Sequence, residues 1–386
     1  MKRIVLIVLD SVGIGETPDA NLYGDIGADT LGKLYKNIPN FKLPTLEKLG
    51  LKNISGTSFY SPHENNIAAF GKMYESSKGK DTTTGHWEMV GLQIDNPFPT
   101  FPNGFDKNIL DEFTKKTGYE VLCNAPYSGT QVIADFGEEH MKTKKLIVYT
   151  SADSVLQIAA HEDVIGIDEL YRVCDIAREI TIKYNIGRVI ARPFLGTNKD
   201  DFYRTTNRKD YALEPFDKIV LEALQENNIN VYAVGKIEDI FLGKGIHDAV
   251  HTKSNLNGID ETLKYINQVE KGLIFTNLVD FDMLYGHRND AEGYANALIE
   301  FDNHLPEIID CLNDDDLLII TADHGCDPSD VSTDHTREYV PLLVYNKNIN
   351  PVDLGIRMTF SDLASTIADF FDVKYICNGT SFKNEI

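Results

Sequence analysis

The sequence predicts an α/β fold in which a mostly parallel central sheet is flanked by helices. Two observations carry this prediction: short apolar runs rich in β-branched residues recur along the chain, and helix-compatible stretches separate several of them. A parallel strand buried on both faces has such a continuous apolar run. The predicted strands are Ile4–Leu9, Leu146–Tyr149, Val189–Ala191, Val231–Val234, Leu273–Leu278 and Leu317–Thr321.

The length of the chain favours two compact units. A chain of 386 residues exceeds the size at which a single hydrophobic core keeps growing. Residues 100–215 contain an arginine-rich stretch and lack the Asp and His turns found elsewhere. We therefore expect an inserted α/β cap domain at 100–215 and a core formed by residues 1–99 and 216–386.

The composition argues against a polyanionic partner. The formal net charge is −22, whereas nucleic-acid affinity depends on Lys and Arg that neutralise phosphates. A phosphorylated small substrate would have to be bound by a local group of cations or metals, because the overall field repels it. We expect a small-molecule substrate and no nucleic-acid partner; the sequence does not indicate an oligomeric state.

The cysteines and the apolar runs favour a cytoplasmic protein. The five cysteines are odd in number and form no C-x-x-C pair, which is typical of free thiols in a reducing compartment. The run Ile4–Leu9 is too short for a signal peptide. No stretch approaches the ~20 apolar residues of a membrane span.

Three of the predicted strands lead into turns that carry carboxylates or imidazoles, where α/β proteins bind ligands. Mixed oxygen and nitrogen donors suit Mn²⁺, Zn²⁺ or Fe²⁺ better than Mg²⁺ or Ca²⁺, and six donors are enough for two metals. The alternative for each carboxylate is a helix cap. The candidate ligands are Asp10, Asp282, His287, Asp323, His324 and His335; we interpret Asp280, Asp327 and Asp334 as capping or ligand-orienting groups.

A hydroxyl-rich segment at residues 79–88 contains the candidate nucleophile. Its sequence, GKDTTTGHWE, places three threonines between two glycines. A hydroxyl between two divalent cations ionises more readily and can attack phosphorus in line. The alternative role is a helix start capped by Asp81 or by a threonine, and both roles can coexist.

Six segments together resemble the phosphopentomutase family of the alkaline phosphatase-like superfamily. They are VLDSVGIG at 8–15, GKDTTTGHWE at 79–88, TSADSVLQIA at 150–159, NLVDFDMLYGH at 277–287, TADHG at 321–325 and TDHTRE at 333–338. The similarity runs from Lys2 to Gly379-Thr380-Ser381-Phe382. It implies an alkaline phosphatase-like α/β core with an inserted cap.

The resemblance also implies a role for individual residues. One Mn²⁺ would be bound by Asp10, Asp323 and His324, and a second by Asp282, His287 and His335. Thr82 would be the phosphorylated threonine. The implied substrate contacts are Ser151, Asp153, Arg188, Arg204 and Lys236, with Arg192 and Arg208 as weaker candidates; the alternative for the arginines is a solvated or salt-bridged surface.

Two positions depart from the family pattern. Thr83 stands where the family often has an apolar residue, so the choice of Thr82 among the three threonines depends on alignment. Cys326 stands where asparagine is usual after Asp-His-Gly. A thiol there can be oxidised or can favour a softer metal, but a buried inert cysteine is the preferred interpretation.

The implied reaction interconverts ribose 1-phosphate and ribose 5-phosphate, and the 2-deoxy pair. It passes through phosphorylated Thr82 and a 1,5-bisphosphate, with a sugar bisphosphate as activator. The alternatives are another superfamily member, such as a phosphoglycerate mutase or a phosphatase, and a binding protein that keeps the fold and the metals. Isomerisation without release of phosphate distinguishes a mutase from both.

Overall fold

The computed structural model describes residues 3–151 and 154–386. The chain divides into two compact units, one formed by Met1–Pro97 with Pro215–Ile386 and the other by Phe98–Glu214. Within the described residues, no helix is long and apolar enough to cross a membrane.

The first unit is built on a sheet that contains eight strands in the described part of the chain, in the order β10-β9-β11-β1-β12-β13-β2-β14. Strand β1 pairs in parallel with both β11 and β12. Among these strands only β13 runs antiparallel to its neighbours. The strands are β1 (Arg3–Leu9), β2 (Ala69–Met73), β9 (Val231–Val234), β10 (Asp248–Val250), β11 (Gly272–Leu278), β12 (Leu317–Thr321), β13 (Val340–Tyr345) and β14 (Asp353–Arg357).

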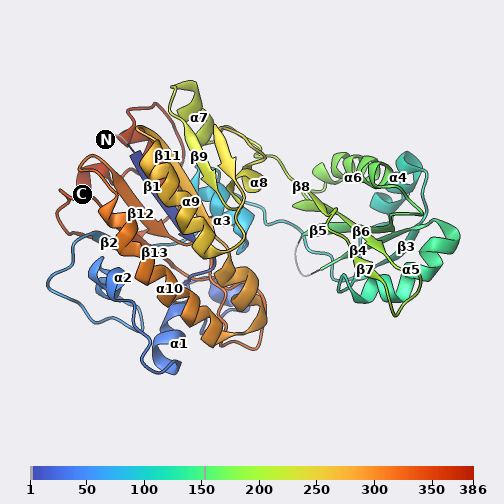
Figure 1. Ribbon diagram of the computed structural model, residues 1–386, viewed down its shortest axis with the longest axis horizontal. Helices are drawn as coiled ribbons and strands as arrows, with labels where there is room; N and C mark the ends of the chain where they lie inside the picture. Colours follow the sequence, from blue (N-terminus) through green and yellow to red (C-terminus); the bar gives the residue numbers. More distant parts are fainter. Residues whose placement is uncertain (1–2, 152–153) are drawn as a thin grey trace. The chain divides into compact units, whose positions relative to one another are not determined.

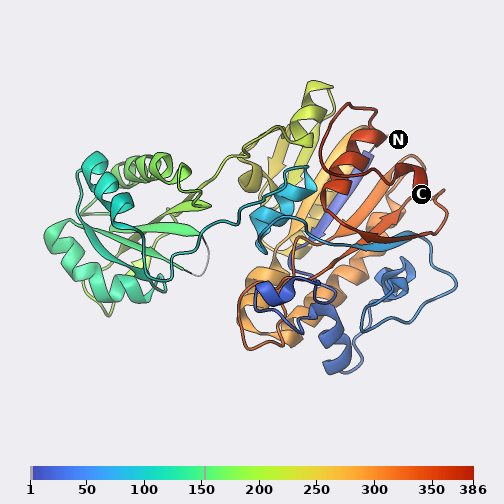
Figure 2. The ribbon, with the colours of Figure 1, turned by 180° about the vertical axis from the view of Figure 1, so that it is seen from behind.

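Helices cover both faces of this sheet. Helices α9 (Asn255–Gln268) and α10 (Ala291–Asp310) cross the face seen in Figure 1. Helices α3 (Thr82–Met89) and α11 (Ser361–Phe370) lie on the opposite face, as the reverse view in Figure 2 shows. Every residue of β1, β11 and β12 is consequently buried, which explains their continuous apolar sequences. The unit also contains α1 (Thr30–Asn37), α2 (Pro44–Lys48), α7 (Val220–Glu226) and α8 (Ile237–Phe241).

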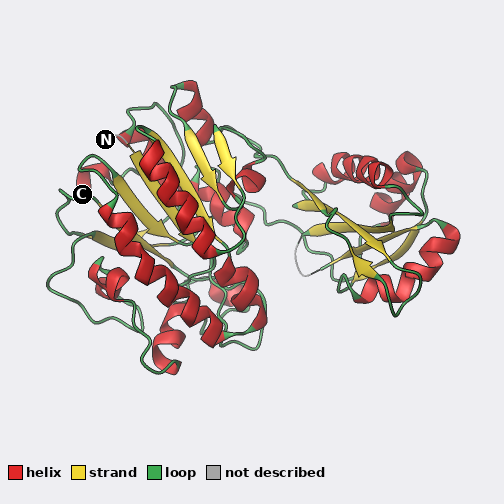
Figure 3. Ribbon diagram, in the orientation of Figure 1, coloured by secondary structure: helices red, strands yellow, loops and turns green. Residues whose placement is uncertain are grey.

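The second unit is a separate sheet with helices on both sides (Figure 3). Its strands follow the order β3-β4-β5-β6-β7, and β8 also pairs with β6. Alternate residues of β4 face different cores: Val148 packs with α6, and Tyr149 packs with α5. The elements are α4 (Lys107–Thr117), β3 (Val121–Pro126), α5 (Gln131–Thr143), β4 (Leu146–Thr150), β5 (Val155–His161), α6 (Ile167–Ile182), β6 (Arg188–Leu195), β7 (Tyr203–Arg204) and β8 (Lys209–Ala212).

The predicted α/β class is confirmed, and each of the six predicted strands lies within an observed strand. They do not all belong to one sheet. Those at Leu146–Tyr149 and Val189–Ala191 lie in the second unit, and the other four lie in the first. The four that remain are adjacent, in the order β9-β11-β1-β12, and they end at a common edge where the predicted ligands begin.

Candidate metal centre

The central strands of the first sheet bring the predicted ligands to one edge. Leu9 at the end of β1 pairs with Leu278 at the end of β11, and Val8 pairs with Thr321 at the end of β12. The turns that follow these three strands therefore start side by side, although β1 ends at Leu9 and β12 only at Thr321. Asp10 occupies the middle turn and is fully buried.

One cluster is formed by Asp10, Asp323 and His324, whose ligand atoms all lie within 4.8 Å of one another. The His324 Nδ1 atom lies 3.0 Å from the Gly325 carbonyl, so this nitrogen carries the proton and donates it. Its Nε2 lone pair is then directed toward Asp10 Oδ1 at 3.5 Å and Asp323 Oδ2 at 3.4 Å. A backbone hydrogen bond thus fixes the tautomer that a metal ligand needs.

The two carboxylates of this cluster are held by their other oxygens. Asp10 Oδ2 accepts a hydrogen bond from the Asn277 side chain at 3.0 Å, and Asp323 Oδ1 accepts one from the Ser11 amide at 3.0 Å. Ser11 adopts a positive φ of 74°, a conformation that non-glycine residues rarely occupy. This turn aims the Ser11 amide at Asp323 and leaves one oxygen of each carboxylate facing inward.

A second cluster contains Asp282, His287 and His335. The Nε2 atoms of the two histidines are 3.1 Å apart, and each lies 3.3 Å from a different oxygen of Asp282. His287 Nδ1 donates to the Thr333 carbonyl at 2.7 Å, which leaves its Nε2 as an acceptor. Asp282 lies in a π-helical turn, η3 (Phe281–Tyr285), and His287 in the next turn, η4 (Gly286–Arg288). Single π turns are frequent at functional sites.

The two clusters are contiguous. The rings of His324 and His335 are tilted by 33° with centroids 4.0 Å apart, and the ligand atoms of both lie within 4.8 Å of the Asp282 carboxylate. The first unit thus gathers the six predicted metal ligands into one continuous group at the edge of its sheet.

The electrostatics of this group fit bound cations. One oxygen each of Asp10, Asp282 and Asp323 is buried without a hydrogen-bond partner. Burial, together with the nearby carboxylates of Asp323 and Asp282, raises the pKa of Asp10 to about 8. Burial opposes the charged form of Asp282 as well, but the adjacent histidines lower its pKa well below the usual range. Three buried carboxylates with free lone pairs need compensating positive charge, and divalent metals would supply it.

Helix α3 brings Thr82 to the same group. Its hydroxyl oxygen lies 3.2 Å from His324 Nε2. Asp81 caps the helix by accepting hydrogen bonds from the amides of Thr83 and Thr84. The buried Thr84 hydroxyl also donates to Asp81, at 2.6 Å, so it is already engaged in the cap. The capping role of Asp81 and the approach of Thr82 to the cluster therefore coexist.

Two neighbours of Thr82 fix the position of α3, and sequence reasoning did not single them out. A Cβ atom at Gly85 would lie 2.2 Å from the Asp323 carbonyl oxygen, so only glycine permits this close contact. His86 is buried, with Nδ1 2.9 Å from the Thr82 carbonyl and 3.2 Å from Asp323 Oδ2. The sequence signal that could have identified His86 was its spacing, because residues four apart lie on the same face of a helix and His86 lies four residues after Thr82.

The three neighbouring acids interpreted as capping or orienting groups have distinct contacts. Asp280 accepts a hydrogen bond from the Asn255 amide at 2.7 Å, at the start of α9. Asp334 accepts one from the His335 amide at 2.9 Å. Asp327 accepts one from the backbone amide that precedes α1. Each therefore holds backbone near the site.

Cys326 lies beside the second cluster. Its sulfur is within 4.8 Å of ligand atoms of Asp282 and His287, and the residue is buried. Burial raises the pKa of this thiol, and the Sγ atom donates a long hydrogen bond of 3.6 Å to the Asp334 carbonyl. These features agree with the interpretation of an unreactive cysteine.

Lys236 also lies at this edge of the sheet. It follows β9 after Gly235, whose φ is +82° and whose added Cβ would lie 2.4 Å from the Asn277 carbonyl oxygen. The ammonium group of Lys236 is close enough to lower the pKa of Asp10 against the effect of burial. A half-buried cation therefore accompanies the acidic cluster.

The remaining predicted substrate residues belong to the second unit. Ser151 follows β4, and Arg188 begins β6, where its amide donates to the Ser154 carbonyl at the same edge of the sheet. Asp153 lies outside the described residues. Arg204 pairs with Phe194, six residues farther along β6. The structure thus separates Arg188 from Arg204 along the strand.

Arg204 instead belongs to a group with the two weaker candidates. Burial raises the pKa of Tyr149, whose hydroxyl has no hydrogen-bond partner, and the nearby positive charges of Arg192, Arg204 and Arg208 oppose this shift. The repulsion among them contributes to a lowered pKa of Arg192, after the larger effect of burial. Arg208 is paired with Asp210 at 2.6 Å, which agrees with the alternative of a salt-bridged surface. The positive charge near the Tyr149 hydroxyl would nevertheless suit an anion.

Comparison with known proteins gives full-length matches. A family model described as the metalloenzyme superfamily matches residues 2–375. A phosphopentomutase of Caldanaerobacter subterraneus is 58% identical over 388 residues, covering 100% of this chain and 98% of its own. A phosphopentomutase of Clostridioides difficile is 54% identical over 389 residues, covering 100% of both chains.

A solved structure shows the same fold at low sequence identity. A phosphoglycerate mutase of Leishmania mexicana superposes with a TM-score of 0.52 at 12% identity, covering 98% of this chain and 97% of its own. At this identity the likeness concerns the fold alone, and it agrees with the predicted alkaline phosphatase-like α/β core.

Proposed function

The chain belongs to the phosphopentomutase family, and from that premise we propose that it interconverts ribose 1-phosphate and ribose 5-phosphate, and their 2-deoxy forms, through phosphorylated Thr82. The observation that carries this proposal is the position of the Thr82 hydroxyl, 3.2 Å from His324 Nε2 at the edge of six metal-type ligands. The general activity, that of an intramolecular phosphotransferase, follows from the family.

Two divalent metals, with Mn²⁺ as the proposed ion, fit the donors of the site. Asp10, Asp323 and His324 would hold one, and Asp282, His287 and His335 the other. Bound there, the metals would make the nucleophilic hydroxyl more acidic and would offset the charge of a phosphoryl group. The three carboxylates bring three negative charges, and a phosphothreonine adds about two more, so two divalent ions leave the site near neutrality.

The side chain of Thr82 carries the phosphoryl group in this proposal. The P–O bond to Thr82 breaks as a P–O bond forms to the free hydroxyl of the sugar phosphate, which gives a 1,5-bisphosphate. The other phosphoryl group then returns to Thr82, and the isomeric monophosphate leaves. A sugar bisphosphate would load Thr82 at the start. His86 supports this role because it contacts both the Thr82 carbonyl and Asp323, and so limits movement of the helix start.

The substrate is proposed to be bound by cations outside the metal ligands. Lys236 lies near Asp10 and can contact an incoming phosphate. In the second unit, the Arg204 group with Arg192 and Arg208 has the character of a phosphate site, since guanidinium groups bind phosphate through paired hydrogen bonds. Ser151, Asp153 and Arg188 remain proposed contacts to the pentose.

The test combines product analysis with mass spectrometry. Phosphorus NMR of the purified protein with ribose 1-phosphate should show ribose 5-phosphate without inorganic phosphate. Incubation with a sugar bisphosphate should add one phosphoryl group to the wild type and to Thr83→Ala, and none to Thr82→Ala. Thr83→Ala is the matched control because it removes the adjacent hydroxyl. Release of phosphate as the main product, or a phosphopeptide in Thr82→Ala, would contradict the proposal.

A further inference from the structure

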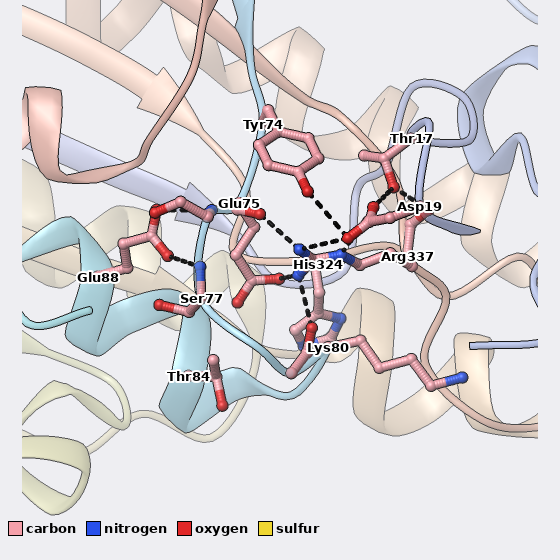
Figure 4. A network of polar contacts seen from close by, with 12 residues as sticks. Thr17, Asp19, Tyr74, Glu75, Ser77, Lys80, Thr84, Glu88, His324 and Arg337 are labelled. Carbon is pink, nitrogen blue, oxygen red and sulfur yellow. Dashed lines mark hydrogen bonds and ion pairs between the residues drawn. The ribbon is translucent and has the colours of Figure 1, made fainter. Parts of the chain in front are cut away.

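Arg337 is a buried cation two residues beyond His335. Its side chain is 1% exposed. The five N–H groups of the guanidinium are matched by five hydrogen bonds, shown in part in Figure 4. Two of these bonds go to Asp19, two to Glu75 and one to the Gly79 carbonyl.

These bonds act on the segment that leads into α3. We define residues 74–81, between β2 and α3, as the nucleophile loop. Arg337 Nη1 donates to the Gly79 carbonyl at 2.6 Å, and Nη2 donates to the Glu75 carbonyl at 2.5 Å. Nη1 also donates to Glu75 Oε2 at 2.6 Å. The guanidinium group thus holds the loop backbone at two residues, Glu75 and Gly79, and Gly79 lies three residues before Thr82.

The backbone of Arg337 belongs to the turn that carries His335. Its amide donates to Asp25 Oδ2 at 2.8 Å, and its carbonyl accepts from the Thr17 amide at 3.2 Å. Lys80 in the nucleophile loop also pairs with Asp25, at 3.0 Å. The His335 turn and the nucleophile loop are therefore joined through Arg337 and through a shared carboxylate.

A second anchor holds the other side of the loop. The buried Glu88 on α3 accepts hydrogen bonds from the amides of Ser76 and Ser77, at 2.9 and 2.6 Å. It also accepts from the Phe360 amide at 2.9 Å, at the start of α11. Glu88 therefore connects the loop to α3 and α11, whereas Arg337 and the Lys80–Asp25 pair connect it to the His335 turn.

We propose that Arg337 is a positioning residue, which fastens the nucleophile loop to the His335 turn and so keeps the Thr82 hydroxyl beside His324. This inference rests on the proposed role of Thr82. Lysine cannot replace arginine here, because an ammonium group has three N–H donors and no planar fork, and five acceptors surround the group. A small displacement of the loop would move Thr82 away from the reacting position.

The alternative is that Arg337 only stabilises the fold, and Arg3 provides the matched control. Arg3 is also buried, and its guanidinium bonds to Asp316 and to the Ile266 carbonyl. It begins β1, at the opposite end of the strand from Asp10. Arg3→Lys therefore removes a comparable buried network far from Thr82.

The experiment compares the metal-loaded wild type, Arg337→Lys and Arg3→Lys. The measurements are kcat, KM, bound metal, melting temperature and hydrogen exchange of peptides covering 74–84. We expect Arg337→Lys to lose kcat about a hundredfold with KM changed less than about threefold, since a misplacement of ~1 Å can have this effect. Its metal content should be unchanged, and exchange in the nucleophile loop should be faster. Arg3→Lys should keep its kcat despite a lower melting temperature.

Three results would overturn the inference. They are a kcat of Arg337→Lys close to the wild-type value, an equal loss of kcat in Arg3→Lys, and loss of bound metal in Arg337→Lys. Loss of bound metal would mean that the substitution disturbs the ligand His335 and not the position of Thr82. The wild type separates this inference from the proposed function: a wild type without mutase activity refutes the function, whereas an active wild type with an equally active Arg337→Lys refutes only the positioning role.

Discussion

Replacing Gly85 by alanine should impair phosphoryl transfer while leaving the fold intact. The added Cβ would lie 2.2 Å from the Asp323 carbonyl oxygen, and ordinary contact begins at 3.4 Å, so α3 must move by about 1.2 Å. The opposing atom belongs to the backbone of the predicted ligand Asp323, so it cannot move aside by a side-chain rotation. A displacement of ~1 Å at a reacting group can reduce kcat by about a hundredfold.

Helix propensity acts in the opposite direction, which makes the test discriminating. Alanine in a helix is favoured over glycine by roughly 0.5–1 kcal/mol, so a simple propensity argument predicts a slightly more stable and fully active protein. The matched control is Gly258→Ala in α9, whose added Cβ would meet the methyl end of the Leu278 side chain, 2.6 Å away. A side-chain end can rotate away, so we expect nearly normal kcat.

The assay is coupled detection of ribose 5-phosphate formation, together with circular dichroism and the fraction of Thr82 phosphorylated by a sugar bisphosphate. Gly85→Ala should have a native spectrum, a strongly reduced kcat and slow phosphorylation. If Gly85→Ala has a kcat within about threefold of the wild type, the close approach of α3 to Asp323 does not control the reaction.

The remaining predictions concern metal, substrate, pH and thiol chemistry. Exhaustive chelation should abolish activity and Mn²⁺ should restore it best; activity that survives metal removal, verified by elemental analysis, would contradict the two-metal assignment. Arg204→Ala should raise KM about ten- to a hundredfold, because a charge-assisted hydrogen bond contributes ~1.5–3 kcal/mol, whereas Arg172→Ala in the same unit should not. Burial, and to a lesser extent His161, lowers the pKa of His140 in the folded state, so the unfolded chain binds a proton first as pH falls. Stability should therefore be complete above the unfolded pKa of ~6.5 and should decline below it, and urea unfolding from pH 7.5 to 5 should show a smaller decline in His140→Gln. Cys326 should resist iodoacetamide in the native protein and react after unfolding, because burial raises its pKa; peptide mapping that finds rapid native labelling would contradict this.

The sequence alone located the ends of the strands that precede the predicted ligands, and it offered a helix start near Asp81 as one interpretation of residues 79–88. The apolar runs before Asp10 and Asp323 are buried on both faces, so periodicity and composition reveal them without a structure. The capping role of Asp81 is equally local, because its side chain bonds to amides two and three residues away. Such signals depend on neighbours in the chain, and a sequence contains them directly.

The tertiary structure decided which of these local features meet. Nothing in the spacing shows that β11 and β12 both flank β1, because strand pairing is set by contacts between distant segments. The same reason explains why the contacts of His86 and Arg337 were not foreseen from the sequence. The partners of Arg337 lie at positions 19, 75 and 79, and only folding brings them within hydrogen-bond distance. The sequence thus determined the chemical groups available to the site, and long-range packing determined how they face one another, since that packing orients α3 so that Thr82 is the threonine beside His324.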